Sequence, residues 1–367
     1  MARFGVRPDD GADDADALQA AIDAAGPRKI LAFAQGVYEF SRPVDLASDQ
    51  TYRGQRGVVM KVQGKRPHFI MDSNAQARIR ISCIAFKGGG IVFRGVNQAI
   101  EVSHNSFEDI YDPKADYGDE SGIFITDVFE AGHIANNRFR KIGYIDGKPG
   151  SAHGNGILAY HLNNTEIVAN TFEDIHQAIS LIFEGWAGSG RGIRVAGNVV
   201  RNPLRMGIEA HGVGTHHAVF EENVVTLTAT GDEDIGMSIV INEGFETVIR
   251  DNRVVSRSPD SRPCSGMGIE VAGIDSRVSG NEIAGHWCAA IGIYSDEMQY
   301  SLVEGNTVCG HRSRYPPIDF YKGKAGSVAR NNTIEKDCSP AQLSPVKARA
   351  VNNVKPRTRP INASRLD

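Results

Sequence analysis

The sequence has no excess of positive charge and no long hydrophobic run. It holds 40 Lys and Arg against 44 Asp and Glu, a formal net charge of −4. A nucleic-acid partner would favour a basic face, so this balance argues against nucleic acid. No apolar run approaches the ~20 residues that a membrane helix needs, so we expect no membrane association. The start, "MARFGVRPDDGADD", turns acidic at once and contains no secretion signal, so we expect a mature chain, a domain, or export by another route.

Cysteine is also scarce and irregularly placed. The five cysteines are Cys83, Cys264, Cys288, Cys309 and Cys338. They are odd in number, lie far apart and include no CxxC pair, so neither a zinc site nor a disulfide framework is indicated. We expect isolated buried or surface thiols.

The sequence does have 40 glycines and a recurring asparagine turn. The turn appears as "HNSFEDI" at 104–110, "NNRFRKI" at 136–142 and "ANTFEDI" at 169–175, and then with a β-branched residue in place of the aromatic one. The asparagines that mark it are Asn105, Asn137, Asn170, Asn198, Asn223, Asn252, Asn281, Asn306 and Asn332. Their spacings of 32, 33, 28, 25, 29, 29, 25 and 26 residues are typical of a solenoid.

Each period carries two further short strands. One precedes the asparagine, and the other begins with glycine or a small residue, as in "GIFIT" (122–126), "GIEAH" (207–211) and "GIEVA" (268–272). No amphipathic helix separates them, which excludes a βαβ alternation. We therefore predict an all-β parallel β-helix whose strands stack from coil to coil. The asparagine side chains should hydrogen-bond one another along this stack and cap backbone groups in the turn.

A short helix is expected ahead of the coils, at 13–26. Leu18, Ala21, Ile22 and Ala25 have helical spacing there, acidic residues precede them, and a Gly-Pro pair ends the segment. A solenoid needs such a lid over its first coil. We predict an entry strand and capping helix over 1–30, the β-helix over 31–340, and a C-terminal tail or partial coil over 341–367, all in one domain.

The stretch "FGVRPDDGADDADALQAAIDAAG", with "ILAFAQGVYEF" and "TYRGQRGVVM" after it, resembles the entry sequence of the pectate-lyase-like superfamily. That resemblance implies a right-handed parallel β-helix, a polysaccharide partner and an extracellular or virion-associated location. The superfamily includes polysaccharide lyases, polygalacturonase-type hydrolases, sugar epimerases and bacteriophage tailspikes. It leaves open whether the chain forms a homotrimer, as tailspikes do.

The resemblance does not select an activity. The sequence lacks the Tyr-Gly-Phe-Asp-Pro-His run of alginate epimerases. It also lacks the polygalacturonase set of Asn-Thr-Asp, Asp-Asp and Gly-His-Gly motifs. No functional residue of the family is therefore carried over, and candidate residues have to come from the strand pattern.

Alternation along the glycine-led strands places their second and fourth residues inside and their third and fifth outside. The third-position column should read Phe124, Leu158, Ser180, Glu209, Ser238, Glu270, Gly292 and Asp319. With rungs about 4.8 Å apart, Glu209 and Glu270 should lie roughly 9.6 Å apart across Ser238. Inverting glycosidases hold their two carboxyl groups about 6.5–9.5 Å apart.

We expect Glu209 and Glu270 to act as general acid and general base, in either order. His211, two residues after Glu209, could tune the pKa of Glu209 or bind a hydroxyl. Asp319 could replace Glu270 in the pair or hold the substrate. The alternative for each carboxylate is a solvated surface position.

Substrate binding is expected from aromatic and basic side chains near the column. Tyr160, Tyr294 and Tyr321 share the fifth-position column, and Trp186 lies in the glycine-rich stretch "FEGWAGSG". Arg205 precedes the Glu209 strand, and His153 lies in an insertion at 143–155 that should overhang the same edge. For the tyrosines, the alternative is a structural stack between coils.

Three functions fit this pattern. The first is a polysaccharide hydrolase that uses the Glu209 and Glu270 pair and needs no cofactor or metal. The second is a lyase or epimerase, in which His211 or Tyr160 is the base and Arg205 or a calcium ion neutralises a uronate. Against it, the column contains acids and no Lys or Arg. The third is a non-catalytic adhesin or tail fibre that only binds glycan.

Overall fold

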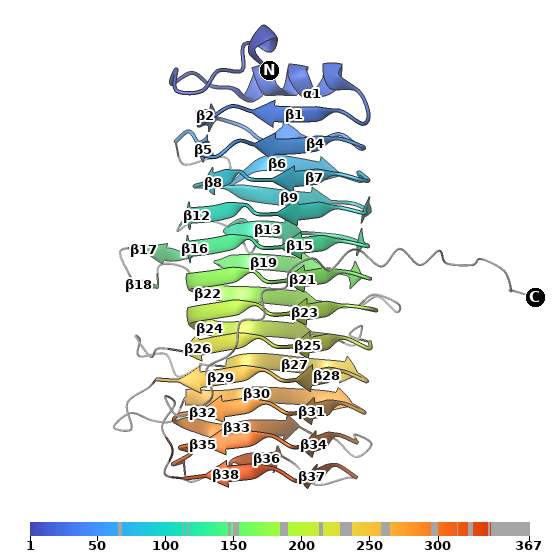
Figure 1. Ribbon diagram of the computed structural model, residues 1–367, viewed down its shortest axis with the longest axis vertical. Coiled ribbons are helices and arrows are strands. Elements are labelled where there is room, and N and C mark those ends of the chain that lie inside the picture. The colour runs from blue at the N-terminus through green and yellow to red at the C-terminus, as the bar shows by residue number, and fades with distance from the viewer. Residues whose placement is uncertain are drawn as a thin grey trace, which may run out of the picture.

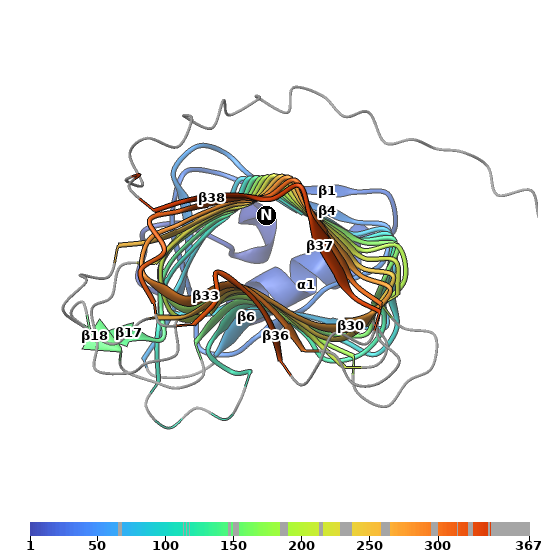
Figure 2. The same ribbon diagram turned by 90° about the horizontal axis from the view of Figure 1, so that it is seen from below.

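The chain winds into one long parallel β-helix, capped at its N-terminal end by a helix (Figure 1). The computed structural model describes residues 1–64, 68–112, 114, 116, 118–145, 148–149, 154–183, 190–212, 216–227, 237–257, 265–294, 300–313, 315–321, 326–336 and 338. In a view along the axis, strands of successive coils lie over one another and form three walls (Figure 2). The predicted all-β solenoid is confirmed.

The first wall, here called the pre-asparagine sheet, is a 12-stranded parallel sheet. Its strands are β1 (Ile30–Phe33), β4 (Thr51–Gly54), β7 (Arg80–Ser82), β11 (Glu101–Ser103), β15 (His133–Ala135), β21 (Glu166–Val168), β23 (Arg194–Ala196), β25 (Val219–Glu221), β28 (Val248–Arg250), β31 (Arg277–Ser279), β34 (Leu302–Glu304) and β37 (Val328–Arg330).

The second wall, the post-asparagine sheet, follows the asparagine turn. It comprises β2 (Gly36–Phe40), β5 (Val58–Val62), β8 (Ala85–Lys87), β12 (Ser106–Ile110), β16 (Arg138–Ile142), the first parts of β22 (Thr171–Ile182) and β24 (Val199–His211), β26 (Val224–Leu227), β29 (Arg253–Ser256), β32 (Glu282–Ala284), β35 (Thr307–Cys309) and β38 (Thr333–Glu335).

The third wall, the glycine-led sheet, carries the candidate site. It comprises β3 (Val44–Asp45), β6 (Phe69–Asn74), β9 (Gly90–Arg94), β13 (Ser121–Ile125), β19 (Asn155–Tyr160), the second parts of β22 and β24, β27 (Met237–Phe245), β30 (Ser265–Ile274), β33 (Trp287–Tyr294) and β36 (Ile318–Tyr321). β22 and β24 run round the corner without a break, so these two walls are hydrogen-bonded into one sheet.

Shorter elements complete the coils. A three-stranded sheet forms where β10 (Asn97–Gln98), β14 (Phe129–Glu130) and β20 (Leu162–Asn163) stack between the glycine-led and pre-asparagine walls. β17 (Tyr144–Ile145) and β18 (Lys148–Pro149) form an antiparallel pair, and η1 (Ala2–Phe4) is a single turn near the N-terminus.

The asparagine ladder forms as predicted. The Nδ2 of Asn137, for example, donates to the carbonyl oxygen of Val102 on the preceding coil at 2.8 Å and to Oδ1 of Asn170 on the next coil at 3.0 Å. The residue before each ladder asparagine has a left-handed backbone, which turns the chain sharply between two walls. Glycine supplies that conformation without a steric cost at Gly197, Gly280 and Gly305.

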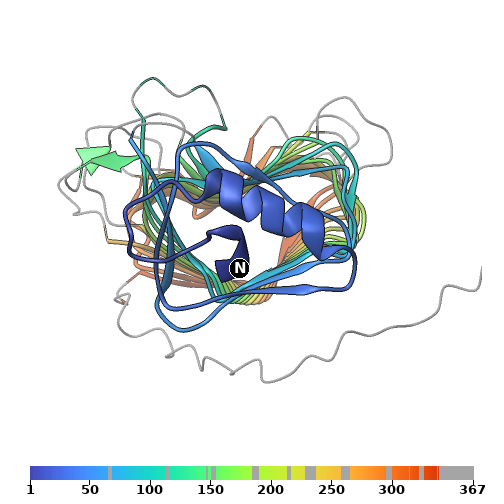
Figure 3. The ribbon, with the colours of Figure 1, turned by 90° about the horizontal axis from the view of Figure 1, so that it is seen from above.

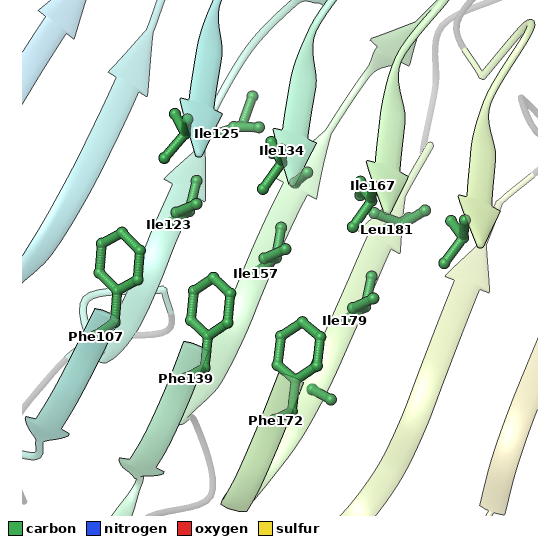
Figure 4. Packing of buried hydrophobic residues seen from close by; sticks show 14 of the residues in the cluster. Phe107, Ile123, Ile125, Ile134, Phe139, Ile157, Ile167, Phe172, Ile179 and Leu181 are labelled. Carbon is green, nitrogen blue, oxygen red and sulfur yellow. The ribbon is translucent and has the colours of Figure 1, made fainter. Parts of the chain in front are cut away.

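The core consists of inward side chains stacked by type (Figure 4). Phe107, Phe139 and Phe172 stack nearly parallel, with ring centroids 4.9 and 4.7 Å apart. Beside them the isoleucines of the glycine-led strands form a continuous ladder, which includes Ile208 and Ile269. Similar apolar side chains meet at most rungs, and the residues predicted to face inward, such as Ile123, Ile208 and Ile269, are fully buried.

α1 (Ala15–Ala25) lies across the N-terminal opening of the spiral (Figure 3). Its buried residues are Ala15, Leu18, Ala21 and Ile22, which cover the first coil, while Ala25 is only partly buried. The helix ends at Gly26, as predicted. Within the described residues, no helix is long and apolar enough to cross a membrane.

The prediction of isolated thiols is wrong for part of the set. Cys309 of β35 and Cys338 form a disulfide 29 residues apart in sequence, with their Cα atoms 5.5 Å apart. These positions lie on successive coils, which brings together residues that seem unrelated in the sequence. Cys83 is a free, exposed thiol. The predicted tail at 341–367 lies outside the described residues.

Candidate functional site

A column of outward-facing residues runs along the glycine-led sheet and carries the candidate acids. In hydrogen-bonded register it reads Leu158, Ser180, Glu209, Val240, Glu270, Gly292 and Asp319. Glu209 and Glu270 are therefore two rungs apart, as predicted, with backbones about 9.6 Å apart. The residue between them is Val240 and not Ser238, so the predicted register of β27 is wrong by two positions. We call this set the acid column.

Glu209, on β24, is half-buried and held from the preceding rung. Its Oε2 accepts a short hydrogen bond from Nε2 of Gln177 and a second one from Oγ of Ser180 at 3.0 Å. Both donors are buried and neutral. A carboxylate oxygen only accepts hydrogen bonds, so this arrangement suits an ionised Glu209 and fixes the direction in which it points.

Glu270, on β30, lies in the opposite kind of environment. It is only 8% exposed, and its Oε2 has no hydrogen-bond partner among the described residues. Val240 precedes it in the column, and the sulfur of Met267 occupies the space above Gly292, the next position. Burial among these apolar groups raises the pKa of the Glu270 carboxyl, and the negative charge of Glu209 raises it further.

Two carboxyl groups on one face thus have contrasting surroundings. One accepts hydrogen bonds from two side chains, while the other is buried without a partner in the described part of the chain. Such a difference separates the tasks of an acid and a base, because a general acid has to stay protonated while its partner is ionised.

No family model matches this chain, and no curated protein matches it in sequence. Solved structures do match. The A-module of the Azotobacter vinelandii mannuronan C-5 epimerase AlgE4 superposes with a TM-score of 0.63 at 12% identity, covering 91% of this chain and 94% of that one. The tailspike protein of E. coli bacteriophage HK620, solved with a pentasaccharide, gives 0.62 at 13% identity, covering 89% and 63%. The GH87 α-1,3-glucanase catalytic unit of Streptomyces thermodiastaticus gives 0.60 at 12%, covering 91% and 68%.

The chain is a right-handed parallel β-helix. This confirms the fold expected from the resemblance to the pectate-lyase-like superfamily. At these identities the likeness concerns the fold, and the neighbours themselves range from an epimerase to a surface adhesin, PfbA of Streptococcus pneumoniae.

Other candidate residues of the β-helix lie around the acid column. Asp319 on β36 is half-buried, two rungs beyond Glu270. His211 lies on the same side of β24 as Glu209 and pairs in register with Ile182 and Asn242. Arg205 is exposed at the bend of β24, between its two walls, and does not join the column.

The aromatic candidates are only partly described. Tyr160 is half-buried at the end of β19, and its ring lies 6.2 Å from that of Phe124, which in turn stacks on Phe69 at 6.1 Å. The backbones of Tyr294 and Tyr321 pair in register, as the predicted column requires. Trp186 and His153 lie outside the described residues.

Two residues at the site have no counterpart in the sequence prediction. Gln177 and Met267 each lie three positions before a column residue, Ser180 and Glu270 respectively, and their side chains reach over the next rung. For Met267 the sequence feature that could have indicated its position is Gly292, because a Cβ atom at 292 would collide with the sulfur of Met267. A glutamine directly before the mostly apolar end of β22, Ala178–Ile182, is the signal for Gln177.

The column is also less open than expected. Leu158, Ser180 and Val240 face outward yet are fully or almost fully buried. Within the described part of the chain, no group of three or more His, Cys, Asp or Glu side chains is arranged to hold a metal ion.

Proposed function

We propose that this β-helix is a carbohydrate-active enzyme, and specifically a glycoside hydrolase that cleaves a polysaccharide at the acid column. The observation that carries the proposal is the pair formed by Glu209 and Glu270, two rungs apart on one face and in contrasting surroundings. Their backbones are about 9.6 Å apart, close to the roughly 6.5–9.5 Å that separates the two carboxyl groups in inverting enzymes.

Glu270 is assigned the role of general acid. Its burial and the charge of Glu209 raise its pKa, which favours the protonated form that an acid needs. In the reaction it donates its proton to the glycosidic oxygen as the bond from that oxygen to the anomeric carbon breaks.

Glu209 is assigned the role of general base. As a carboxylate oriented by Gln177 and Ser180, it takes a proton from a water molecule, and the water oxygen forms the new bond to the anomeric carbon. One proton enters the leaving group and one leaves the water, so the carboxyl pair ends with its protonation states exchanged. Solvent then restores the starting state.

The solved neighbours support polysaccharide as the ligand class, since they include a mannuronan epimerase, a glucanase and a tailspike solved with a pentasaccharide. A lyase or epimerase is the alternative enzyme, with His211 or Tyr160 as base. It is less well supported, because Arg205 lies outside the column and no described column residue is basic. A purely glycan-binding β-helix is the non-catalytic alternative.

The test is digestion of a glycan panel, with reducing ends and the ultraviolet absorbance of unsaturated uronates measured together. New reducing ends without that absorbance indicate a hydrolase, and the absorbance indicates a lyase. We expect Glu209→Gln and Glu270→Gln each to lower kcat by about 10²–10⁴-fold. The matched control is Glu282→Gln on β32 of the post-asparagine sheet, which should keep wild-type turnover. No cleavage of any glycan by the wild-type protein would contradict the proposal.

A further inference from the structure

Carboxylates on other faces of the β-helix are neutralised by arginines from adjacent rungs. Glu221 lies between Arg194 and Arg250, at 2.7 and 2.5 Å. Glu304 is paired with both Arg277 and Arg330 in the same way. Ion pairing between rungs is therefore the usual arrangement for acids on the pre-asparagine sheet.

The acid column departs from this arrangement. Among the described residues, Glu209, Glu270 and Asp319 form no ion pair with any Lys, Arg or His. The hydrogen bonds to Glu209 come from neutral groups, and Glu270 is more than nine-tenths buried with Oε2 unpartnered in the described structure. The carboxyl groups of the column thus have no counter-ion in the described structure, so a cationic ligand that supplies one gains affinity.

The neighbouring rungs add no described cation to the face. Apart from Arg205 at the bend of β24 and His211 at its end, the described glycine-led strands have one basic residue, Arg94, and its Nε lies 3.0 Å from Oδ2 of Asp72, which neutralises it. The column therefore carries acidic side chains on three of the five rungs from Glu209 to Asp319, and no lysine or arginine.

We propose that the acid column takes a cationic glycan, an oligosaccharide with free protonated amino groups such as a glucosamine polymer. The inference rests on the proposed function in taking the same face as the substrate site. Asp319, two rungs past the catalytic pair, would hold an amino group of the chain beyond the cleaved bond. A polyuronate is disfavoured, because its carboxylates would face the carboxylates of Glu209 and Asp319 without a described counter-ion.

The test is calorimetric binding of three oligosaccharides of equal length: glucosamine, its N-acetylated neutral counterpart, and a galacturonate. We expect the glucosamine chain to bind at least about 10-fold more tightly than the N-acetylated chain at low salt, and the ratio to fall as ionic strength rises. Asp319→Asn should reduce the ratio several-fold. Asp275→Asn, which removes one charge at an exposed turn after β30, should leave it unchanged.

Equal or weaker binding of the glucosamine chain, or a ratio that Asp319→Asn does not change, would overturn the inference. This readout is independent of cleavage. A protein that cleaves a neutral glycan but shows no cationic preference retains the proposed function and loses this inference. One that binds glucosamine chains without cleaving any glycan retains the inference and loses the proposed function.

Discussion

At the scale of the residue, Glu270 links stability to pH. The pKa of its side chain is higher in the folded protein than in the unfolded chain, where it is about 4.3. Below the unfolded pKa the side chain is protonated in both states, and its contribution to folding stability is fully present. That contribution is lost as the pH rises through the folded pKa. Glu270→Gln removes the ionisation. We therefore expect the variant to gain stability relative to wild type as pH rises from 4 to 8.

Thermal unfolding across that pH range measures the effect. The Tm difference between variant and wild type should be smallest at the acidic end and grow steadily toward neutral pH. Glu282→Gln, on a different wall, should show no such trend. A constant difference for Glu270→Gln would mean that Glu270 titrates like an ordinary exposed glutamate.

Gln177 tests whether Glu209 needs to be held in one orientation. Gln177→Leu keeps similar volume and removes the donor to Glu209, a hydrogen bond worth about 1.5–3 kcal/mol when the acceptor is charged. We expect kcat/KM to fall about 10-fold or more, with a smaller change in Tm than a core truncation would cause. Gln177→Glu, which places a second acid against Glu209, should be worse than Gln177→Leu. Unchanged kcat/KM in both variants would remove Gln177 from the site.

At the scale of the element, the asparagine ladder should behave as a cooperative stack. Asn223 is fully buried; its Oδ1 accepts from the backbone and side chain of Asn198, and its Nδ2 donates to Val195 and Asn252. Asn223→Ala leaves several of these buried groups unpaired, so we expect a loss of about 3 kcal/mol in the free energy of unfolding.

Asn332 provides the comparison. It is the last ladder member in the described part of the chain and is only half-buried, so Asn332→Ala should cost less than half as much. Urea denaturation monitored by circular dichroism measures both. Equal losses would show that position along the ladder does not matter.

The strands also show which structural features the sequence repeat predicts and which it does not. The asparagine ladder, the inward isoleucines and the three walls can be predicted from the repeat, because equivalent positions of successive coils pair with each other. The register of β27 does not. Aligning Gly236 with other leading glycines placed Ser238 in the column, but a shift of two positions keeps every side chain on its own face, so alternation cannot detect it. The actual register is the one that pairs Ile208, Ile239 and Ile269.

At the scale of the whole molecule, α1 should keep the spiral from associating end to end. Leu18 is fully buried between the helix and the first coil. Leu18→Asp buries an unpaired charge there, so we expect a loss of at least about 3 kcal/mol and exposure of the first strand edge. Light scattering after gel filtration should then detect self-association. Ala20→Asp, on the exposed side of α1, should keep the stability and the monodispersity of the wild type.

The contrast between the two glutamates could not be predicted from the sequence. The spacing of Glu209 and Glu270 follows from the repeat, but their surroundings depend on side chains of other coils. Gln177 reaches Glu209 from the preceding rung, and Met267 covers the position after Glu270. The Cys309 and Cys338 pair was missed for the same reason, since only the completed coil brings the two together. The sequence therefore predicts which residues share a face, and the structure adds what surrounds each of them.

The account depends most on Glu270 and Glu209 acting as an acid and base pair, and product analysis by proton NMR during glycan digestion tests this most directly. The prediction is that wild type releases a product of inverted anomeric configuration. Glu209→Gln and Glu270→Gln should each slow its release by about 10²–10⁴-fold, and Glu282→Gln should release it at the wild-type rate. Retention of wild-type turnover by both Glu209→Gln and Glu270→Gln, or a product with retained configuration, would contradict it.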